Sequence, residues 1–401
     1  MEDGRKPLPR PPRRIPANAG SLTQMEPPVR PVHPAAPHPA APQPRRPWIF
    51  GRILAGLLVL LVIVAGGAAA GWYFREQTLR IDAAEVQKTV GPAVVRVLAT
   101  TCSGTGEASG VLIENGRVLT AASAVERPQS IVVVAPDGRM RRANLLGTSA
   151  DGVAVLQSIG FNETPVQLPS TDPDPKAERA LIGYTAAGKQ VVNAIGSAED
   201  PEALSQFMNA AKLGGPVLDK TGALVGLVTG DTVQAATVVP LANLRGYSAQ
   251  APTGITVAAA AECAEPKGPQ PAVAPQLQVA RTPLALEAQA LLGKYLTLEN
   301  KHDFGALQEL YSKKLAKTMT VARDRQGHRT SYFFNAKLTD LAPDGSYARM
   351  SSNVLFSPTA QGANGGSCNR LDARYDLIRE AGKLVIDGAT YVRQPVACDT
   401  D

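Results

Sequence analysis

The sequence predicts a multidomain protein that combines one transmembrane helix, an all-β domain of the barrel or sandwich type, and an α+β domain. Three observations support this fold class. An unbroken apolar run lies near the N-terminus, short apolar runs separated by turn residues follow it, and the last third places apolar residues at helical spacing before further strand-like runs. With 401 residues, the chain is also too long for one ordinary domain.

Composition shifts divide the chain into five parts. They are a Pro/Arg-rich tail at 1–47, the transmembrane helix at 48–74, a first exported domain at 75–250, an Ala/Pro-rich linker at 251–283 and a second exported domain at 284–401. The tail has too little apolar surface to offset the entropy of ordering, so we expect it to be disordered or in polyproline II conformation. It serves either as a solvated spacer or as a docking segment through its Pro-rich stretches.

The apolar run at 53–74 is long enough for a transmembrane helix, since about 22 residues at 1.5 Å rise per residue span a hydrocarbon core of about 30 Å. Arg45, Arg46 and Arg52 crowd its N-terminal flank. Positive residues favour the inner side, so we expect a cytoplasmic N-terminus, a single pass through the cell membrane and extracytoplasmic domains. A cleaved signal peptide is the alternative, but the run is too long and follows an extended region.

The formal net charge of +6 does not indicate a nucleic-acid partner. Most of the excess lies in the tail, and the rest of the chain is near neutral. The basic residues of the tail are Arg5, Lys6, Arg10, Arg13, Arg14, Arg30, Arg45 and Arg46. Binding to nucleic acid needs a basic patch on a folded surface, so no nucleic-acid partner is predicted.

The first exported domain reads as a series of short strands. The run at 93–99 predicts one strand, and the runs at 110–113 and 117–120 predict a hairpin through Glu-Asn-Gly. Another strand at 130–135 ends at Pro-Asp-Gly. The Asn-Gly and Asp-Gly pairs supply the positive φ that tight hairpins need. A helical stalk at 75–89 connects this domain to the membrane helix.

Several segments of this domain, in this order, resemble trypsin-like serine proteases of the Deg/HtrA type. The segments are Pro92–Val97, Ala108–Ile113, Val118–Val125, Asp151–Leu156, Leu181–Tyr184, Lys212–Asp219 and Gly222–Thr229. The resemblance covers about residues 85–248 and implies a double β-barrel with the activity of a serine endopeptidase. The stretch at 188–212 is shorter than in that family, which implies that the second barrel half is trimmed.

The same resemblance implies that the catalytic triad is absent. Ser123 stands where the family has its histidine, Gly152 with Asp151 beside it where the family has its carboxylate, and Leu213 where it has its nucleophile. A serine hydroxyl needs an imidazole to take its proton, and a carboxylate orients that imidazole. The chain has 4 histidines, and none lies between residues 39 and 301. We therefore predict an inactive protease homologue.

An active protease of unusual mechanism is the first alternative. A Ser-Lys arrangement would use Lys212 or Lys220 near Ser205. A ligand-binding protein that acts through its C-terminal domain is the second alternative. The favoured interpretation is a binding or scaffold module at the cell envelope, whose partner is a protein or peptide.

The residues that line the substrate groove in active relatives have counterparts in this chain. They are Gly214, Gly215, Val228, Thr229 and Gly230. Glycine lets one backbone approach another closely, so a peptide could add here as an extra strand. The alternative is that these glycines only shape the barrel.

The second exported domain begins with apolar residues at helical spacing, which predict helices at 284–300 and 304–315. Strands are predicted at 330–338, 347–356, 371–379 and 383–392. Helices followed by a strand meander resemble the NTF2-like α+β fold. The polar candidates Asp340, Asp344, Asp372 and Asp387 read as turn or exposed strand positions. No metal-ligand spacing is present, and we predict no cofactor.

All 4 cysteines follow the apolar run, where an extracytoplasmic location favours disulfides. Three pairings are possible. Pairing within domains joins Cys102 to Cys263 and Cys368 to Cys398, and we favour it over free thiols. A hairpin at 371–392 would bring Cys368 and Cys398 together.

Overall fold

The computed structural model describes residues 49–196, 200–257, 263, 265–269, 272–357 and 367–399. The chain divides into two units, residues 1–67 and 68–401. The predicted tail at 1–47 lies outside the described residues.

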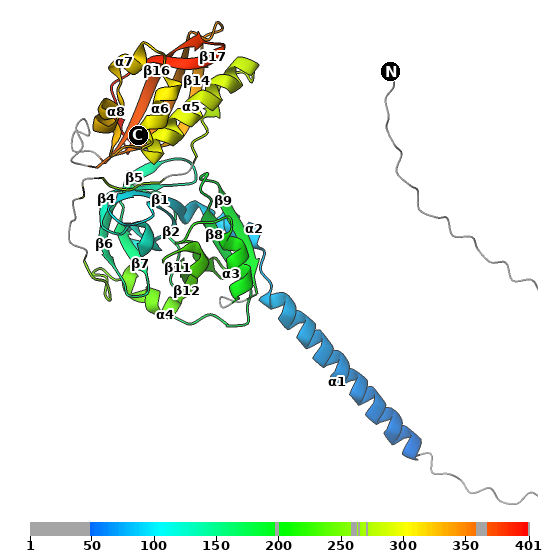
Figure 1. Cartoon of the computed structure of the whole chain (residues 1–401). Coiled ribbons are helices and arrows are strands. Elements are labelled where there is room, and N and C mark those ends of the chain that lie inside the picture. The colour runs from blue at the N-terminus through cyan, green and yellow to red at the C-terminus, as the bar shows by residue number, and fades with distance from the viewer. Residues whose placement is uncertain are drawn as a thin grey trace, which may run out of the picture. The chain divides into compact units, whose positions relative to one another are not determined.

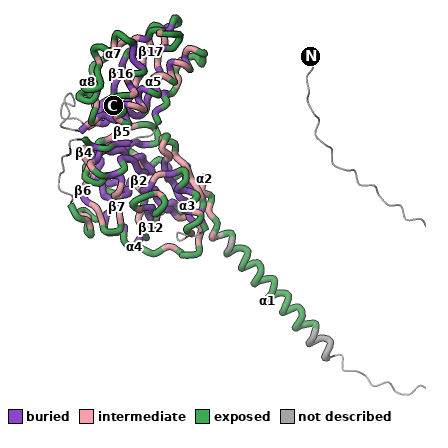
Figure 2. Tube along the Cα trace, viewed as in Figure 1, coloured by how far each residue is buried: buried purple, intermediate pink, exposed green. Residues whose placement is uncertain are grey.

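The apolar run forms a single long helix, α1 (Ile49–Leu79). Its stretch Ala55–Arg75 has a mean hydropathy of 2.2 and is 0% buried, and Figure 2 shows this stretch in green as exposed. It is long and apolar enough to cross a membrane, and both membrane anchors and signal sequences have these properties. The predicted stalk is divided, because α1 continues to Leu79 and a separate helix α2 (Ala83–Val90) begins after its N-cap Asp82.

The first half of the barrel is an antiparallel sheet with the strand order β5-β4-β1-β2-β3-β7-β6 (Figure 1). Its strands are β1 (Val94–Thr101), β2 (Glu107–Ile113), β3 (Arg117–Ala121), β4 (Pro128–Val134), β5 (Met140–Arg142), β6 (Asn144–Thr148) and β7 (Val153–Gln157). The predicted hairpin is present, with φ of 64° at Asn115 and 65° at Gly116. Every residue of β1, β2 and β3 is buried, since the sheet curls around a shared apolar core.

The second half is a sheet with the order β12-β11-β10-β8-β9. Its strands are β8 (Arg179–Tyr184), β9 (Gln190–Ile195), β10 (Pro216–Leu218), β11 (Leu224–Thr229) and β12 (Thr237–Pro240). Helix α3 (Pro201–Met208) lies within the stretch that we expected to be trimmed, and helix α4 (Leu241–Leu244) follows β12. An apolar cluster that includes Leu204, Phe207 and Met208 packs α3 against this sheet.

The C-terminal region packs helices against one face of an antiparallel sheet (Figure 1). The helices are α5 (Pro283–Lys301), α6 (Phe304–Leu307), α7 (Leu315–Thr318) and α8 (Val321–His328). The strands are β13 (Gln276–Leu277), β14 (Tyr332–Leu341), β15 (Tyr347–Leu355), β16 (Cys368–Glu380), β17 (Lys383–Tyr391) and β18 (Val396–Ala397). The four long strands follow the predicted ranges within a few residues. The short β13 pairs in parallel with β14, whereas the four long strands pair antiparallel.

The predicted second helix at 304–315 is wrong in its length. The helical turns that begin at Phe304 end at Leu310, because Tyr311 adopts an extended conformation. Tyr311 forms a bridge with Ile386, and the Ser312 amide donates to the Ile386 carbonyl over 2.8 Å. Pairing with a strand far along the chain therefore overrides the local helical spacing.

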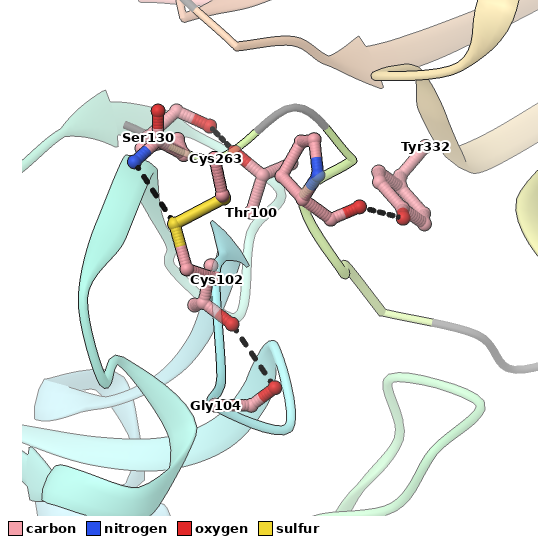
Figure 3. The surroundings of a disulfide bond; sticks show 9 residues. Thr100, Cys102, Gly104, Ser130, Cys263 and Tyr332 are labelled. Carbon is pink, nitrogen blue, oxygen red and sulfur yellow. Dashed lines mark hydrogen bonds between the residues drawn. A yellow bond between two sulfur atoms is a disulfide. The ribbon is translucent and has the colours of Figure 1, made fainter. Parts of the chain in front are cut away.

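The linker at 251–283 is not a free spacer along its described residues. Thr256 pairs with Thr148 of the barrel, and Lys267 pairs with Thr101 at the end of β1. The hydroxyl of Tyr332 on β14 donates to the Pro266 carbonyl over 2.6 Å, as Figure 3 shows beside a disulfide. The described part of this segment therefore makes backbone and side-chain hydrogen bonds with both the barrel and the C-terminal region.

Candidate functional site

Ser123, which the resemblance aligns with the histidine of the family, lies in the short turn that follows β3. Its hydroxyl donates to the Gly230 carbonyl over 2.7 Å. Its own carbonyl accepts the Thr105 amide at 2.9 Å. The hydroxyl and the carbonyl of Ser123 are therefore both hydrogen-bonded within the chain, and the side chain links the two barrel halves.

Gly152 lies in the turn between β6 and β7 with φ of +77°, which favours glycine. Its carbonyl accepts the Ala122 amide at 2.8 Å, so the structure brings the second predicted position beside the first. The neighbouring Asp151 carboxylate accepts the Asn243 side-chain amide at 2.8 Å, and the Asp151 carbonyl accepts the Thr229 hydroxyl at 3.1 Å. The carboxylate of Asp151 thus binds a residue of α4.

Leu213, which the resemblance aligns with the nucleophile of the family, has 6% of its surface exposed. It belongs to an apolar cluster with Phe207 and Val228. Its carbonyl accepts the Ser109 amide at 2.7 Å. An alkyl side chain has no proton to lose and no lone pair to donate, so this position cannot attack a carbonyl.

Two of the three predicted groove glycines, Gly214 and Gly215, are fixed by close backbone packing. A side chain at Gly214, where φ is +88°, would lie 2.2 Å from the Ser109 carbonyl oxygen. The Gly214 amide donates to the Val228 carbonyl at 2.7 Å, and the Val228 amide donates to the Gly215 carbonyl at 2.9 Å. The amide and the carbonyl of Val228 are therefore both hydrogen-bonded within the chain.

The other two groove residues continue this pattern. Thr229 pairs with Thr237 in the ladder between β11 and β12. Gly230 has φ of +147°, and a side chain there would lie 2.6 Å from the Ala235 carbonyl oxygen. The Gly230 carbonyl also accepts the Ser123 hydroxyl, so a peptide that adds here as a strand would share or displace this contact.

Two cavities flank these positions and share Thr105 and Asp231. The first has a volume of about 480 Å³ and includes Ser123 in its lining. The second has a volume of about 290 Å³ and includes Lys212 and Leu213. Space for a ligand thus remains beside Ser123 and beside Leu213.

A largely buried ion cluster contributes Glu107 and Lys212 to the lining of the second cavity. The Arg96 guanidinium lies 2.5 Å from a carboxylate oxygen of Glu107, and both side chains are less than 10% exposed. The Lys212 ammonium lies 3.4 Å from the other Glu107 oxygen. Lys212, a candidate of the Ser-Lys alternative, is therefore ion-paired with Glu107. Sequence analysis missed Glu107, since only the pairing of β1 with β2 brings it beside Arg96.

The structure contains the two disulfides favoured by the sequence. Cys102 is bonded to Cys263 with 5.7 Å between their Cα atoms (Figure 3). Cys368 is bonded to Cys398 with 5.4 Å between Cα atoms. Within the described ranges, no group of three or more His, Cys, Asp or Glu side chains is arranged to hold a metal ion.

The polar candidates of the C-terminal region have local partners. Asp372 is ion-paired with Arg349 and Arg393. Asp387 accepts the Ser312 hydroxyl at 2.6 Å and the Lys314 ammonium at 3.0 Å. In the turn before β15, the Asp344 carboxylate accepts from Ser346, and Asp340 accepts the Tyr347 hydroxyl at 3.1 Å. These contacts stabilise strands and turns.

A buried polar cluster that the sequence pattern does not indicate includes Glu299 of helix α5. Glu299 is 0% exposed, and neither carboxyl oxygen makes a hydrogen bond of ordinary geometry with the described residues. Burial, reinforced by the charge of Asp324, raises the pKa of Glu299 to about 8, and the Tyr295 hydroxyl opposes this shift only in part. His328 lies 4.0 Å from Glu299. Asp324 accepts the Tyr311 hydroxyl at 3.2 Å.

Comparison with known families identifies the barrel. Residues 108–227 match the family model of the trypsin-like peptidase domain. The chain therefore contains a trypsin-like peptidase domain, as the order of its sequence segments predicted.

Two solved structures illustrate the likeness. The chain is similar to the serine endoprotease from Yersinia pestis, with 22% identity and a TM-score of 0.36, over 42% of this chain and 67% of that one. It is also similar to the active form of the Rv3671c protease from M. tuberculosis, with 20% identity and a TM-score of 0.35, over 44% of this chain and 88% of that one. A comparison with curated proteins found no match.

Proposed function

We propose that this protein is a membrane-anchored, exported serine-protease homologue without catalytic activity, which acts as a binding or scaffold module for a protein or peptide partner at the cell envelope. Its trypsin-like domain would by family be a serine endopeptidase. The proposal therefore depends on what occupies the catalytic positions.

One observation carries the proposal: Ser123, which the resemblance aligns with the histidine, donates its hydroxyl to the Gly230 carbonyl. No histidine lies between residues 39 and 301. His302 and His328 belong to the ends of α5 and α8 in the C-terminal region. Without an imidazole beside it, a hydroxyl is a weak nucleophile at neutral pH.

Labelling with a fluorophosphonate tests this proposal against an active protease of unusual mechanism. We expect the purified exported part to remain unlabelled and to leave casein intact over hours. A matched active trypsin-like protease is the positive control. Covalent labelling of one serine would contradict the proposal, and loss of that label in a Lys212→Ala variant would point to a Ser-Lys mechanism.

The binding role is supported by the two cavities beside Ser123 and Leu213. Cross-linking in native envelopes, followed by capture of the protein, tests it. We expect cross-links from this cleft to one partner, and these should be lost when Asp231, which lines both cavities, is replaced by Arg. Unchanged cross-links in that variant would place the partner surface elsewhere.

We further propose that the C-terminal α+β domain is NTF2-like and contributes a binding surface. Helices that precede a curled antiparallel sheet and cover one of its faces support this assignment. An experimental structure of the exported part, superposed on NTF2-like domains, tests it. A strand order different from theirs would contradict the assignment.

A further inference from the structure

Helix α8 packs on the C-terminal region through titratable side chains. Asp324 is its one buried residue, with 1% of its surface exposed, and His328, one turn later on the same face, is half-buried. Every other residue of α8 is exposed. A surface helix normally buries an apolar stripe. The inner face of α8 therefore carries a carboxylate and an imidazole where apolar side chains are usual.

The inward contacts of Asp324 are made with neutral donors. Its carboxylate accepts the Gln308 side-chain amide at 3.0 Å and the Tyr311 hydroxyl at 3.2 Å. These hydrogen bonds orient the carboxylate, but they bring no positive charge to offset its own. The docking of α8 therefore depends on the ionisation of its inner face.

The other contacts of α8 are exposed and weak. Arg325 is ion-paired with Glu265 at 3.8 Å, where the two side chains are 58% and 64% exposed, and its guanidinium lies 5.9 Å from the ring centroid of Phe304. Exposed ion pairs of this kind contribute little to stability. Among the described residues, the apolar core clusters include none from α8.

Glu299 of α5 lies behind this inner face. It is 0% exposed, and its carboxyl group lies 4.0 Å from the His328 imidazole. Neither of its oxygens makes a hydrogen bond of ordinary geometry with the described residues. A buried carboxylate without partners is strongly disfavoured, so Glu299 either keeps its proton or must be reached by water. Movement of α8 gives water access with few contacts to break.

The hydroxyls that face Glu299 stay neutral. Tyr295 of α5 lies 5.7 Å from Tyr375 of β16 and 6.5 Å from Tyr311, measured between ring centroids. Burial raises the pKa of all three tyrosines further above the neutral range. The charge of this interior is therefore set by its carboxyl groups and histidines.

The carboxyl groups and the histidines respond to pH in opposite directions. Burial lowers the pKa of His328 and of His302, which follows α5, so these residues oppose docking as pH falls. Burial raises the pKa of Asp324 and of Glu299, the latter to about 8, so the carboxyl groups oppose docking as pH rises. The shift of Glu299 is large, and we therefore expect the effect of rising pH to dominate.

We propose that α8 is a pH-sensitive latch over the interior of the C-terminal region. It packs over Glu299 while this carboxyl group keeps its proton, and it opens as the proton is lost. Glu299 and Asp324 then both carry negative charge, and water that enters beneath α8 solvates them. None of these residues lines the cleft of the trypsin-like domain, so the inference is independent of the proposed function.

Hydrogen exchange of the exported part, followed by mass spectrometry and corrected for the intrinsic exchange rates, tests this inference. We expect the protection of α8 amides to fall at least tenfold between pH 5 and pH 8, because rising pH favours the open state in which Glu299 is solvated. At pH 8, α8 should also be at least tenfold less protected than β15, whose amides report unfolding of the whole region. Equal protection of α8 and β15 at pH 8 would overturn the inference, and this comparison needs no variant.

Glu299→Gln should abolish the fall in α8 protection, since the amide cannot ionise. Glu309→Gln is the matched control, because Glu309 is exposed and lies next to Gln308, and its ion pair with Lys294 spans 3.8 Å. This control should show the same fall as wild type. A fall that persists in Glu299→Gln, or that is lost equally in Glu309→Gln, would contradict the latch.

Discussion

At the residue scale, Gly214 combines two restrictions in one position. Its φ of +88° disfavours any side chain, and a Cβ would lie 2.2 Å from the Ser109 carbonyl oxygen. The same residue bonds to Val228 and so fixes the strands that a substrate groove would use. The glycines of this groove are therefore required by the fold, whatever their role in binding.

We expect Gly214→Ala to lower the free energy of unfolding by about 3 kcal/mol or more, because backbone strain and a steric clash add. Gly138→Ala is the control, since Gly138 also has φ of +88° but nothing lies within 4 Å of its Cβ position. Urea unfolding of the exported part measures both. Equal losses in the two variants would mean that strain alone, and not packing, makes Gly214 necessary.

Glu299 gives the protein a pH dependence. Its folded-state pKa of about 8 lies above the ordinary value of 4.5. The fold therefore favours the protonated carboxyl, and the stability from this group is complete below the ordinary pKa and is lost as pH rises toward 8. Asp324 acts in the same direction, since burial raises its pKa. His328 acts in the opposite direction, since burial lowers its pKa.

We expect Glu299→Gln to reduce the loss of stability between pH 5 and pH 8 by a few kcal/mol, because the amide cannot ionise. The change in unfolding free energy between the two pH values is measured for wild type and for the variant. The difference between these two changes gives the contribution of Glu299, separate from those of Asp324 and His328. Urea unfolding at the two pH values measures it. Parallel curves for the two proteins would mean that Glu299 is ionised or solvated at neutral pH.

At the element scale, local signals were predictable and long-range pairings were not. The hairpin at Asn115 followed from its Asn-Gly turn alone, and the Cys368–Cys398 pair followed from the neighbouring strand hairpin. In contrast, Tyr311 leaves its helix to pair with Ile386, 75 residues further along the chain. The bond from Ser123 to Gly230 spans 107 residues. Nothing near such residues in the sequence indicates their partners.

The Cys368–Cys398 bond supports the sheet to which β16 belongs. It closes a loop with a sequence separation of 30. In the chain-entropy model, this contributes about 3 to 4 kcal/mol. We expect a Cys368→Ser/Cys398→Ser variant to unfold at correspondingly lower urea concentration, and peptide mapping of the unreduced protein should recover the linked pair. A variant as stable as wild type would mean that the unfolded chain gains little freedom when this bond is absent.

At the scale of the whole molecule, the proposed topology gives a further prediction. We expect protease added to spheroplasts to digest the part after Trp72 and to spare an epitope at the N-terminus, because Arg45, Arg46 and Arg52 favour the cytoplasmic side. Immunoblotting with antibodies against both ends measures the outcome, and lysed cells provide the control for complete digestion. Protection of the C-terminal region with loss of the N-terminal epitope would reverse the orientation.

The Cys102–Cys263 bond also determines what a peptide-bond cut can release. The two cysteines are separated by 161 residues, so the bond encloses strands β2 to β12 in one covalent ring. A single nick anywhere in that ring leaves both fragments joined. A nick inside the ring would therefore release the C-terminal region from α1 only after the disulfide is reduced. Without reduction, release would require a cut outside the ring, either between α1 and Cys102 or after Cys263.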